Sequence, residues 1–299
     1  MNEPRHFITG TELRREELLG LIARARELKR AGSDGSRPLQ HKSVAILLAR
    51  PSTRTRASFE VGIAQLGATP VVLRSEELQL ARGESPRDTA LVLSRYVDAI
   101  VARPGADATI EELARYAGVP VINALTPLHH PCQALADLMT LEERFGSLEG
   151  LRVAYVGDGN NVCHSLMLLG SAVGVEVAVA TPPDLQPDET IVAQAGDLVS
   201  VGHNPREAAA GAHAIYADVW VSMGDEAEAD RRRRLLAPFR LDEDLLSVAG
   251  EDAVALHCLP AHPGEEITEG VLYGERSAVW DQAENRLHTQ KALLEFLLG

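Results

Sequence analysis

The sequence has little cysteine, a deficit of positive charge and no long apolar run. Its three cysteines, Cys132, Cys163 and Cys258, stand far apart and cannot make a fully paired disulfide framework, which is typical of a reducing compartment. No apolar run approaches the roughly 20 residues of a membrane-spanning helix, and the first residues lack the apolar core of a secretory signal. We therefore expect a cytoplasmic protein that does not enter a membrane.

The charge balance argues against polyanionic partners. The chain has 29 Lys and Arg against 43 Asp and Glu, which gives a formal charge of −14. We therefore expect neither nucleic acid nor an anionic membrane surface as a partner. The run 225–234 ends in four arginines, but acids stand four residues ahead of Arg232 and Arg234, which is the spacing of ion pairs on a solvated helix face.

The 299 residues are enough for two domains, and strand-like and helix-like segments alternate along most of the chain. Such alternation predicts parallel sheets with helices on both faces, so the expected fold class is α/β, with two open parallel-sheet αβα domains linked by helices. The expected strands are 43–49, 69–73, 98–103, 119–123, 151–156, 175–180, 197–201, 213–219 and 253–257. The expected domains are 1–145 and 146–282, followed by a C-terminal helix, 283–299, that packs back toward the first domain.

The stretch Arg50–Arg56 lies between an expected strand and an expected helix. Backbone N–H groups and the helix dipole at such a point favour an anion. Three hydroxyls and two guanidiniums on that turn add donors that suit a phosphate group. The alternative is an ordinary Ser52 helix cap beside solvated arginines. Because residues two apart do not share a helix face, we expect Arg54 to reach the ligand and Arg56 to make a structural contact.

Polar side chains also follow other expected strands, at the edge where open α/β sheets bind ligands. They are Arg103; His130, Pro131 and Gln133; Asn160 and Asn161; Asp218, Trp220, Ser222 and Met223; and His257 to Pro260. Taken singly, each has a structural reading: a helix cap for His130 or Asp218, a small buried residue for Cys258, a core filler for Met223. Their coincidence at one kind of edge favours a binding site.

No metal site and no cofactor are expected. His257 and Cys258 are adjacent and only His262 is near them, which is not the ligand spacing of a closed zinc site.

The turn 157–161 (Gly-Asp-Gly-Asn-Asn) invites a dinucleotide reading, but two features oppose it. Val162 stands where the third glycine belongs, and the strand 175–180 ends without the acid that would hold a ribose. We expect the turn instead to project Asn161 from a helix N-terminus toward a zwitterionic or carboxylate substrate.

Four motifs together resemble the carbamoyltransferase family. They are Ser52-Thr-Arg-Thr-Arg56, His130-Pro-Cys-Gln133, Asp218-Val-Trp-Val-Ser-Met-Gly224 and His257-Cys-Leu-Pro260. The first two are shared by the aspartate and ornithine branches and argue only for carbamoyl phosphate, whereas the last two match the ornithine branch. The resemblance runs nearly from end to end, and it implies a carbamoyl-phosphate domain followed by a Rossmann-like ornithine domain.

Carried over to this chain, the resemblance implies two sets of binding residues. Those for carbamoyl phosphate are Ser52, Thr53, Arg54, Thr55, Gln79, Arg103, His130, Pro131, Cys132, Gln133, Cys258, Leu259 and Arg286. Those for ornithine are Asn161, Asp218, Ser222 and Met223. Gln79 is similar to a residue that a neighbouring subunit lends to the site, which implies a homo-oligomer, a trimer in the family.

The implied reaction, a step of arginine metabolism, is attack of the ornithine δ-amine on carbamoyl phosphate. The residues implied in catalysis are Arg54, Arg103, His130, Asp218 and Cys258. The amine, with a pKa of about 10.4, must lose a proton before it attacks. Asp218 and Cys258 are candidates to position and desolvate it, and which of them accepts the proton, if either does, does not follow from the sequence.

Carbamoyl phosphate is labile in water, so we also expect domain closure with motion of the loop 222–224. Two other functions stay open. One is carbamoyl transfer to another amine, such as putrescine, an N-acylated ornithine or aspartate. The other is a catalytically silent protein that binds carbamoyl phosphate.

Overall fold

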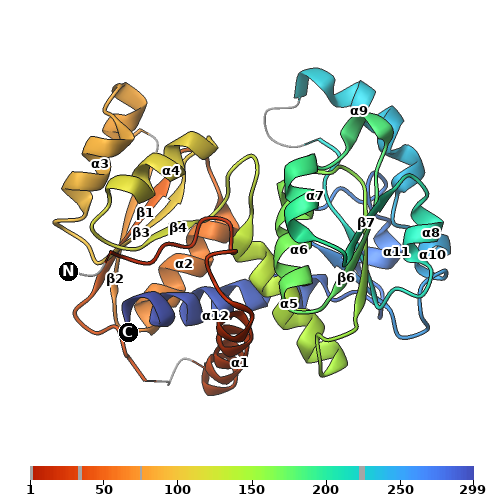
Figure 1. Ribbon diagram of the computed structural model, residues 1–299, viewed down its shortest axis with the longest axis horizontal. Coiled ribbons are helices and arrows are strands. Elements are labelled where there is room, and N and C mark those ends of the chain that lie inside the picture. Colours follow the sequence, from red (N-terminus) through yellow and green to blue (C-terminus); the bar gives the residue numbers. More distant parts are fainter. Residues whose placement is uncertain (1–2, 33–35, 75, 222–225) are drawn as a thin grey trace. The chain divides into compact units, whose positions relative to one another are not determined.

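The computed structural model describes residues 3–32, 36–74, 76–221 and 226–299. The chain divides into two compact units, each described here by itself (Figure 1). Unit 1 comprises residues 1–136 and 285–299, and unit 2 comprises residues 137–284. The helices α5 (Pro131–Phe145) and α12 (Val279–Leu298) contribute residues to both units.

A parallel sheet in the order β2-β1-β3-β4 forms the centre of unit 1. Its strands are β1 (Ser43–Leu48), β2 (Thr69–Arg74), β3 (Ala99–Arg103) and β4 (Val121–Asn123). Its other helices are α1 (Arg15–Ala31), α2 (Thr53–Gln65), α3 (Pro86–Leu93), α4 (Asp107–Tyr116) and the 3-10 turn η2 (Gln79–Arg82). Figure 1 shows α3 and α4 over one face of this sheet and α2 with α12 over the other.

The strand order of unit 1 reverses beside β1. The chain leaves β1 for β2 on one side and returns to β3 on the other, so the end of β1 and the end of β3 border the same gap. β1 is held there by an apolar run that is buried from Val44 to Leu48. In open α/β sheets, ligands bind at such a switch point beyond the carboxyl ends of the strands.

Unit 2 is built on a parallel sheet in the order β7-β6-β5-β8-β9. Its strands are β5 (Arg152–Val156), β6 (Glu176–Ala180), β7 (Val199–Gly202), β8 (Ala214–Ala217) and β9 (Val254–His257). Its other helices are α6 (Asn161–Ala172), α7 (Glu189–Ala195), α8 (Pro205–Ala209), α9 (Ala229–Leu236), α10 (Glu243–Leu246) and α11 (Glu269–Leu272). The switch point of this sheet lies between β5 and β8.

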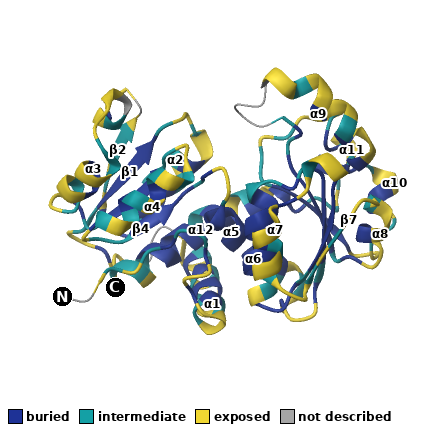
Figure 2. Ribbon diagram, turned by 45° about the horizontal axis from the view of Figure 1, so that its top comes forward, coloured by how far each residue is buried: buried dark blue, intermediate teal, exposed yellow. Residues whose placement is uncertain are grey.

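The centre of unit 2 is strongly apolar. β5, β6, β8 and β9 are almost wholly buried, and α6 is buried from Val162 to Gly170, as the dark blue ribbon of Figure 2 shows. A helix that is apolar on all sides is typical of a position between other elements. α6 therefore offers a rigid base for the residues at its N-terminus.

The structure confirms the expected α/β class, with strands near every range that the sequence indicates. One expectation is wrong in extent: the last helix begins at Val279, not at 283. Val279 and Gln282 are fully buried in unit 2, and the amphipathic pattern of the later residues does not reveal this first turn. In the described part of the chain, no helix combines the length and apolarity needed to cross a bilayer.

Candidate active site

The N-terminus of α2 lies at the switch point of unit 1, and its Ser52 does not act as an ordinary helix cap. Ser52 occupies the N-cap position in an extended conformation, but its side chain makes no hydrogen bond to the helix. Its hydroxyl instead accepts a hydrogen bond from Arg103 Nη1 at 2.9 Å, at the end of β3. The first N–H groups of α2 are therefore not satisfied by this side chain, which favours the anion-site interpretation over the plain cap.

The two arginines of this helix turn differ in their contacts. Arg56 forms an ion pair with Glu60, with 3.0 Å between Nε and Oε2, which is the structural contact predicted for it. Arg54 lies on the exposed side of the first turn. The expectation that Arg54, rather than Arg56, reaches a ligand stays a prediction.

Arg286 of α12 joins three of the expected residues inside unit 1. Its Nη1 donates to Gln133 Oε1 at 2.6 Å, and its Nη2 donates to Thr55 Oγ1 at 3.1 Å. The ring Nε2 of His130 lies 3.5 Å from Nη1 of the same guanidinium. Thr55, His130, Gln133 and Arg286 are all buried, so this network is preorganised rather than assembled by a ligand.

The electrostatics of this cluster keep His130 neutral. Burial lowers the pKa of His130 well below its ordinary value, and the positive charges of Arg286, Arg103 and Arg54 lower it further. A neutral imidazole beside three guanidiniums can donate or accept a hydrogen bond without adding charge. The cluster therefore concentrates positive charge on the arginines in a chain whose formal charge is −14.

Three other residues expected at the carbamoyl phosphate site have different surroundings. The thiol of Cys132 donates to the Asn123 carbonyl at 3.3 Å and is fully buried, and burial raises its pKa to about 12. Only the main chain of Cys132 is therefore available to a ligand. Pro131 is the first residue of α5, and Gln79 is an exposed residue of η2.

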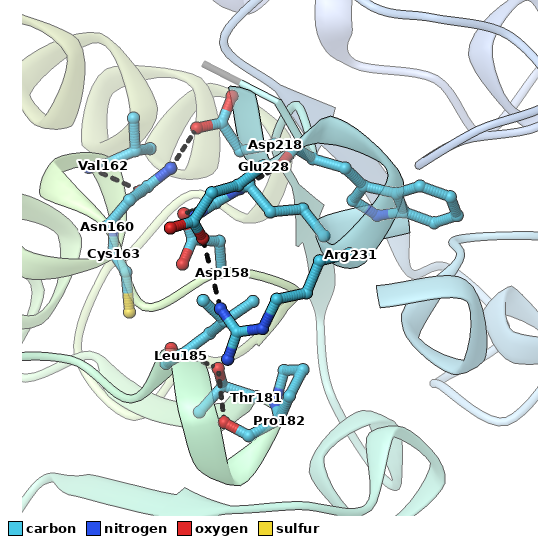
Figure 3. Close-up of polar contacts among 12 residues, drawn as sticks. Asp158, Asn160, Val162, Cys163, Thr181, Pro182, Leu185, Asp218, Glu228 and Arg231 are labelled. Carbon is cyan, nitrogen blue, oxygen red and sulfur yellow. Dashed lines mark hydrogen bonds and ion pairs between the residues drawn. The ribbon is translucent and has the colours of Figure 1, made fainter. Parts of the chain in front are cut away.

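Unit 2 gathers a second polar cluster at its own switch point. Asp218, just after β8, is buried with 5% of its surface exposed. Its Oδ2 accepts a hydrogen bond from Asn160 Nδ2 at 2.7 Å, and its Oδ1 accepts one from the Cys258 thiol at 2.9 Å. Figure 3 shows Asn160 and Asp218 facing each other across the dashed line of that first bond. The structure thus joins Asp218 and Cys258, which are 40 residues apart in sequence.

From the sequence we expected Asn161 to face the substrate and assigned no specific role to Asn160. Asn161 is the first residue of α6 and is half-buried, whereas Asn160 is the N-cap and the direct partner of Asp218. The sequence did contain a sign of this role for Asn160. Two asparagines stand where a helix is expected to begin, and only the first of them can occupy the N-cap position. The cap position, rather than the resemblance, identifies Asn160.

The backbone around Cys258 is held by a buried histidine. His257 Nδ1 accepts the Leu259 N–H at 2.9 Å, and His257 Nε2 lies 3.2 Å from Glu266 Oε1. Leu259 adopts a left-handed φ of 59°. Asp218, His257 and Cys258 each offer a potential metal-ligand atom within 4.8 Å of the others. Both ring nitrogens of His257 already have partners, so a metal would have to displace one of them.

The expectation that the arginine run 231–234 is fully solvated is wrong for Arg232. Its exposed fraction is 7%; it forms an ion pair with Asp158, and its Nε donates to the Trp220 carbonyl at 2.7 Å. The four-residue spacing considers one helix alone, so it does not anticipate a contact with Asp158 from another segment. Arg231 pairs with Glu228, three residues before it, at 3.2 Å. The expected ornithine residues Ser222 and Met223 lie outside the residues that the structure describes.

The turn 157–161 is crossed by another segment of unit 2. A Cβ atom on Gly159 would clash with the Pro187 nitrogen and would lie 2.6 Å from the Gln186 carbonyl carbon. The Gly159 N–H also donates to the Leu185 carbonyl at 2.8 Å. Glycine is required here by protein backbone, and not by the approach of a pyrophosphate.

The sequence also matches known families over both units. Residues 5–143 match the carbamoyl-P binding domain of aspartate/ornithine carbamoyltransferases, and residues 149–297 match the Asp/Orn binding domain. The chain therefore belongs to the aspartate/ornithine carbamoyltransferase family.

Individual relatives belong to the ornithine branch. An ornithine carbamoyltransferase of Acidothermus cellulolyticus is 53% identical over 302 residues, which cover 98% of this chain and 96% of the relative. The crystallised ornithine carbamoyltransferase of Pyrococcus furiosus is similar in fold, with a TM-score of 0.94 and 47% identity over 99% of this chain and 98% of its own. The enzyme of the same name from Thermus thermophilus gives a TM-score of 0.91 at 43% identity, with both chains fully covered.

Proposed function

We propose that this chain transfers the carbamoyl group of carbamoyl phosphate to the δ-amine of L-ornithine, giving L-citrulline and phosphate. One observation carries the proposal: beside a helix N-terminus that the Ser52 side chain does not cap, His130 is buried and the positive charges of Arg286, Arg103 and Arg54 lower its pKa. Relatives about half identical in sequence are named for this reaction, which supports ornithine as the acceptor. A Pyrococcus furiosus relative, 51% identical, is named anabolic, which supports a role in arginine synthesis.

In unit 1, the proposed roles follow from the donors. Residues 52–55 and the N–H groups of α2 bind the phosphate, with Arg54 as the charged donor. Arg103, His130 and Thr55 hold the carbonyl oxygen, and they stabilise the negative charge that develops on it when the amine attacks. Such prearranged donors are typically worth about 3–4 kcal/mol each in the transition state. Arg286 contacts the carbonyl side of carbamoyl phosphate, and its hydrogen bonds hold the side chains of Gln133 and Thr55 in place.

In unit 2, the proposed ornithine site is the Asp218 cluster, with Asn161 and the residues Ser222 and Met223. The carboxylate of Asp218 attracts the cationic amine, and the thiol of Cys258 lies on the same carboxylate. The carbonyl carbon and the amine nitrogen must come within bonding distance for transfer, so the reaction requires both ligands at once. We expect closure of the domains, with the 222–224 loop, to achieve this and to exclude water.

The proposal also includes an oligomeric state and a cellular location. We infer a homotrimer in which Gln79 reaches the site of a neighbouring subunit, supported by the exposure of Gln79 in η2. We also infer a cytoplasmic location, because the three cysteines form no disulfide.

The proposal is tested by following the carbamoylated product formed from carbamoyl phosphate with L-ornithine, putrescine, N-acetylornithine and aspartate in parallel; with ornithine this product is citrulline. We expect turnover with ornithine alone. Preferred turnover of another amine would assign the alternative transferase. Absence of turnover with every amine, together with binding of carbamoyl phosphate, would assign the catalytically silent protein.

A further inference from the structure

We infer that Asn160 is a positioning residue, whose side-chain amide fixes the Asp218 carboxylate in the orientation that the amino substrate meets. The inference rests on the proposed function for its catalytic consequence, and on the geometry of unit 2 for its structural content. It concerns a residue to which neither the motifs nor the proposed mechanism gives a role.

The orientation of the Asn160 amide is determined by its surroundings. Its Oδ1 receives the Val162 N–H at 3.0 Å, the Cys163 N–H at 3.3 Å and the Tyr155 hydroxyl at 3.1 Å. Backbone N–H groups can only donate, so the atom that faces them must be the oxygen. The Nδ2 group therefore has to face away from α6, toward Asp218, and donates to Oδ2 at 2.7 Å.

The supports of Asn160 are rigid. Tyr155 belongs to the central strand β5 and is fully buried, and Val162 and Cys163 lie in the buried first turn of α6. A donor held by a strand and a helix restricts the rotation of the carboxylate that it contacts. The remaining acceptor capacity of Asp218 is then presented in one direction, beside the Cys258 thiol.

Substitutions at Asn160 can separate helix capping from the contact to Asp218. Asn160→Ser keeps a strong N-cap acceptor but removes the donor to Asp218. Asn160→Asp keeps the cap and replaces the donor with a carboxylate. Asn204 offers a matched control: it caps α8 through Arg206 N and Glu207 N, and its Nδ2 donates to Glu207 Oε1 at 2.8 Å on the exposed surface.

The effect of pH distinguishes the two Asn160 variants. In Asn160→Asp at low pH, the introduced carboxyl group and Asp218 share a proton, and the protonated partner can donate as the amide does; at higher pH the two charges repel. Three other titratable groups lie around Asp218: Tyr155, Tyr216 and Cys163. Burial raises the pKa of each well above its ordinary value, so all three stay neutral. His257 and Cys258 also lie at this cluster, and both are present in the wild type and in the two variants.

The test measures kcat/KM for ornithine and KM for carbamoyl phosphate between pH 6.5 and 9, in the full-length protein. Asn160→Ser should lower kcat/KM for ornithine about 10- to 100-fold at every pH, because it removes a hydrogen bond to a charged group. Asn160→Asp should show a deficit that grows at least about tenfold as pH rises. KM for carbamoyl phosphate should change less than about twofold, and so should every constant of Asn204→Ser and Asn204→Asp.

A second readout does not depend on the substrate. Cys258 is partly exposed whereas Cys132 and Cys163 are fully buried, so iodoacetamide should label Cys258 selectively, and Cys258→Ser should abolish that label. Asn160→Asp should slow the labelling at least about threefold, because added negative charge disfavours the thiolate.

Four outcomes are decisive. A kcat/KM of Asn160→Ser within twofold of wild type would overturn the inference. If kcat/KM fell equally for both Asn160 variants at all pH values, or fell equally for the Asn204 variants, Asn160 would act only as a helix cap. Absence of ornithine turnover in the wild type would refute the proposed function instead, and the labelling rates would then decide the inference: unchanged rates would overturn it.

Discussion

Both units gather polar groups at the switch point of a parallel sheet, but the two switch points hold groups of opposite charge. In unit 1, three arginines and a helix N-terminus meet beside a neutral histidine. In unit 2, a buried carboxylate accepts bonds from an amide and a thiol. The groups also differ in how they are held, since Arg54 is exposed whereas Asp218 is buried. The comparison indicates that the switch points of two parallel sheets can hold polar groups of different charge while the layered architecture is kept.

The comparison is tested most strongly at Arg54. Arg54→Ala should lower kcat/KM for carbamoyl phosphate by about a thousandfold, because it removes a charged donor at an oxyanion site. Arg56→Ala, two residues away, should change it less than about threefold, since Arg56 is occupied by Glu60 on the surface. Steady-state kinetics of the two variants measure both effects, and comparable losses would remove the distinction drawn between the two side chains.

The corresponding change in unit 2 is Asp218→Asn. We expect kcat/KM for ornithine to fall by about a hundredfold or more, because the amide keeps the shape of the side chain but loses the charge that attracts the amine. Since Asp218 and the arginine cluster belong to different units, KM for carbamoyl phosphate at saturating ornithine should stay within about threefold. A rise of that KM as large as the loss for ornithine would show that the two clusters do not act separately.

Stability should distinguish the buried ion pair of unit 2 from its exposed neighbour. Arg232→Ala should lower the free energy of unfolding by about 3 kcal/mol, because it removes one partner of a buried ion pair, that with Asp158. Arg231→Ala should cost less than about 1 kcal/mol, since its pairs with Glu228 and Asp184 are half exposed. Urea denaturation of both variants measures the difference, and similar midpoints would mean that the Asp158 contact contributes nothing.

The smallest expected effect is the pH dependence that His130 gives to unit 1. The folded pKa of His130 is lowered, chiefly by burial, so the unfolded chain binds the extra proton below about 6.5 and the folded chain does not. Stability should therefore fall as pH drops below that value, by at most about 1.4 kcal/mol per pH unit, and it should be fully present above it. His130→Gln should remove this part of the slope in urea denaturation between pH 5 and 7.5; an unchanged slope would contradict a neutral, buried His130.

The comparison also shows which features the sequence could predict. The turn at residues 50–56 could be singled out as a candidate anion site because its donors are contiguous and lie between a strand and a helix. Helix and strand ranges followed from periodicity, and the α/β class followed from their alternation. The order of strands did not follow, because every alternating chain is compatible with several orders. The switch points, which explain why Arg103 lies beside Ser52, therefore come from the structure alone.

Contacts between distant residues account for the rest. The bonds of Asp218 to Asn160 and Cys258 join segments 58 and 40 residues apart, and no local pattern encodes them. Arg232 was misread because a four-residue spacing describes a helix surface only when that surface faces solvent. Burial of Arg232 follows from the position of Asp158 on a different loop.

The central claim is that the cationic cluster of unit 1 binds carbamoyl phosphate without help from the Asp218 carboxylate of unit 2. Calorimetric titration of carbamoyl phosphate into wild type, Arg54→Ala and Asp218→Asn tests it directly. The account predicts that Asp218→Asn binds within about threefold of the wild-type Kd, and that Arg54→Ala binds at least about a hundredfold more weakly. Weak binding by Asp218→Asn, or wild-type binding by Arg54→Ala, would contradict it.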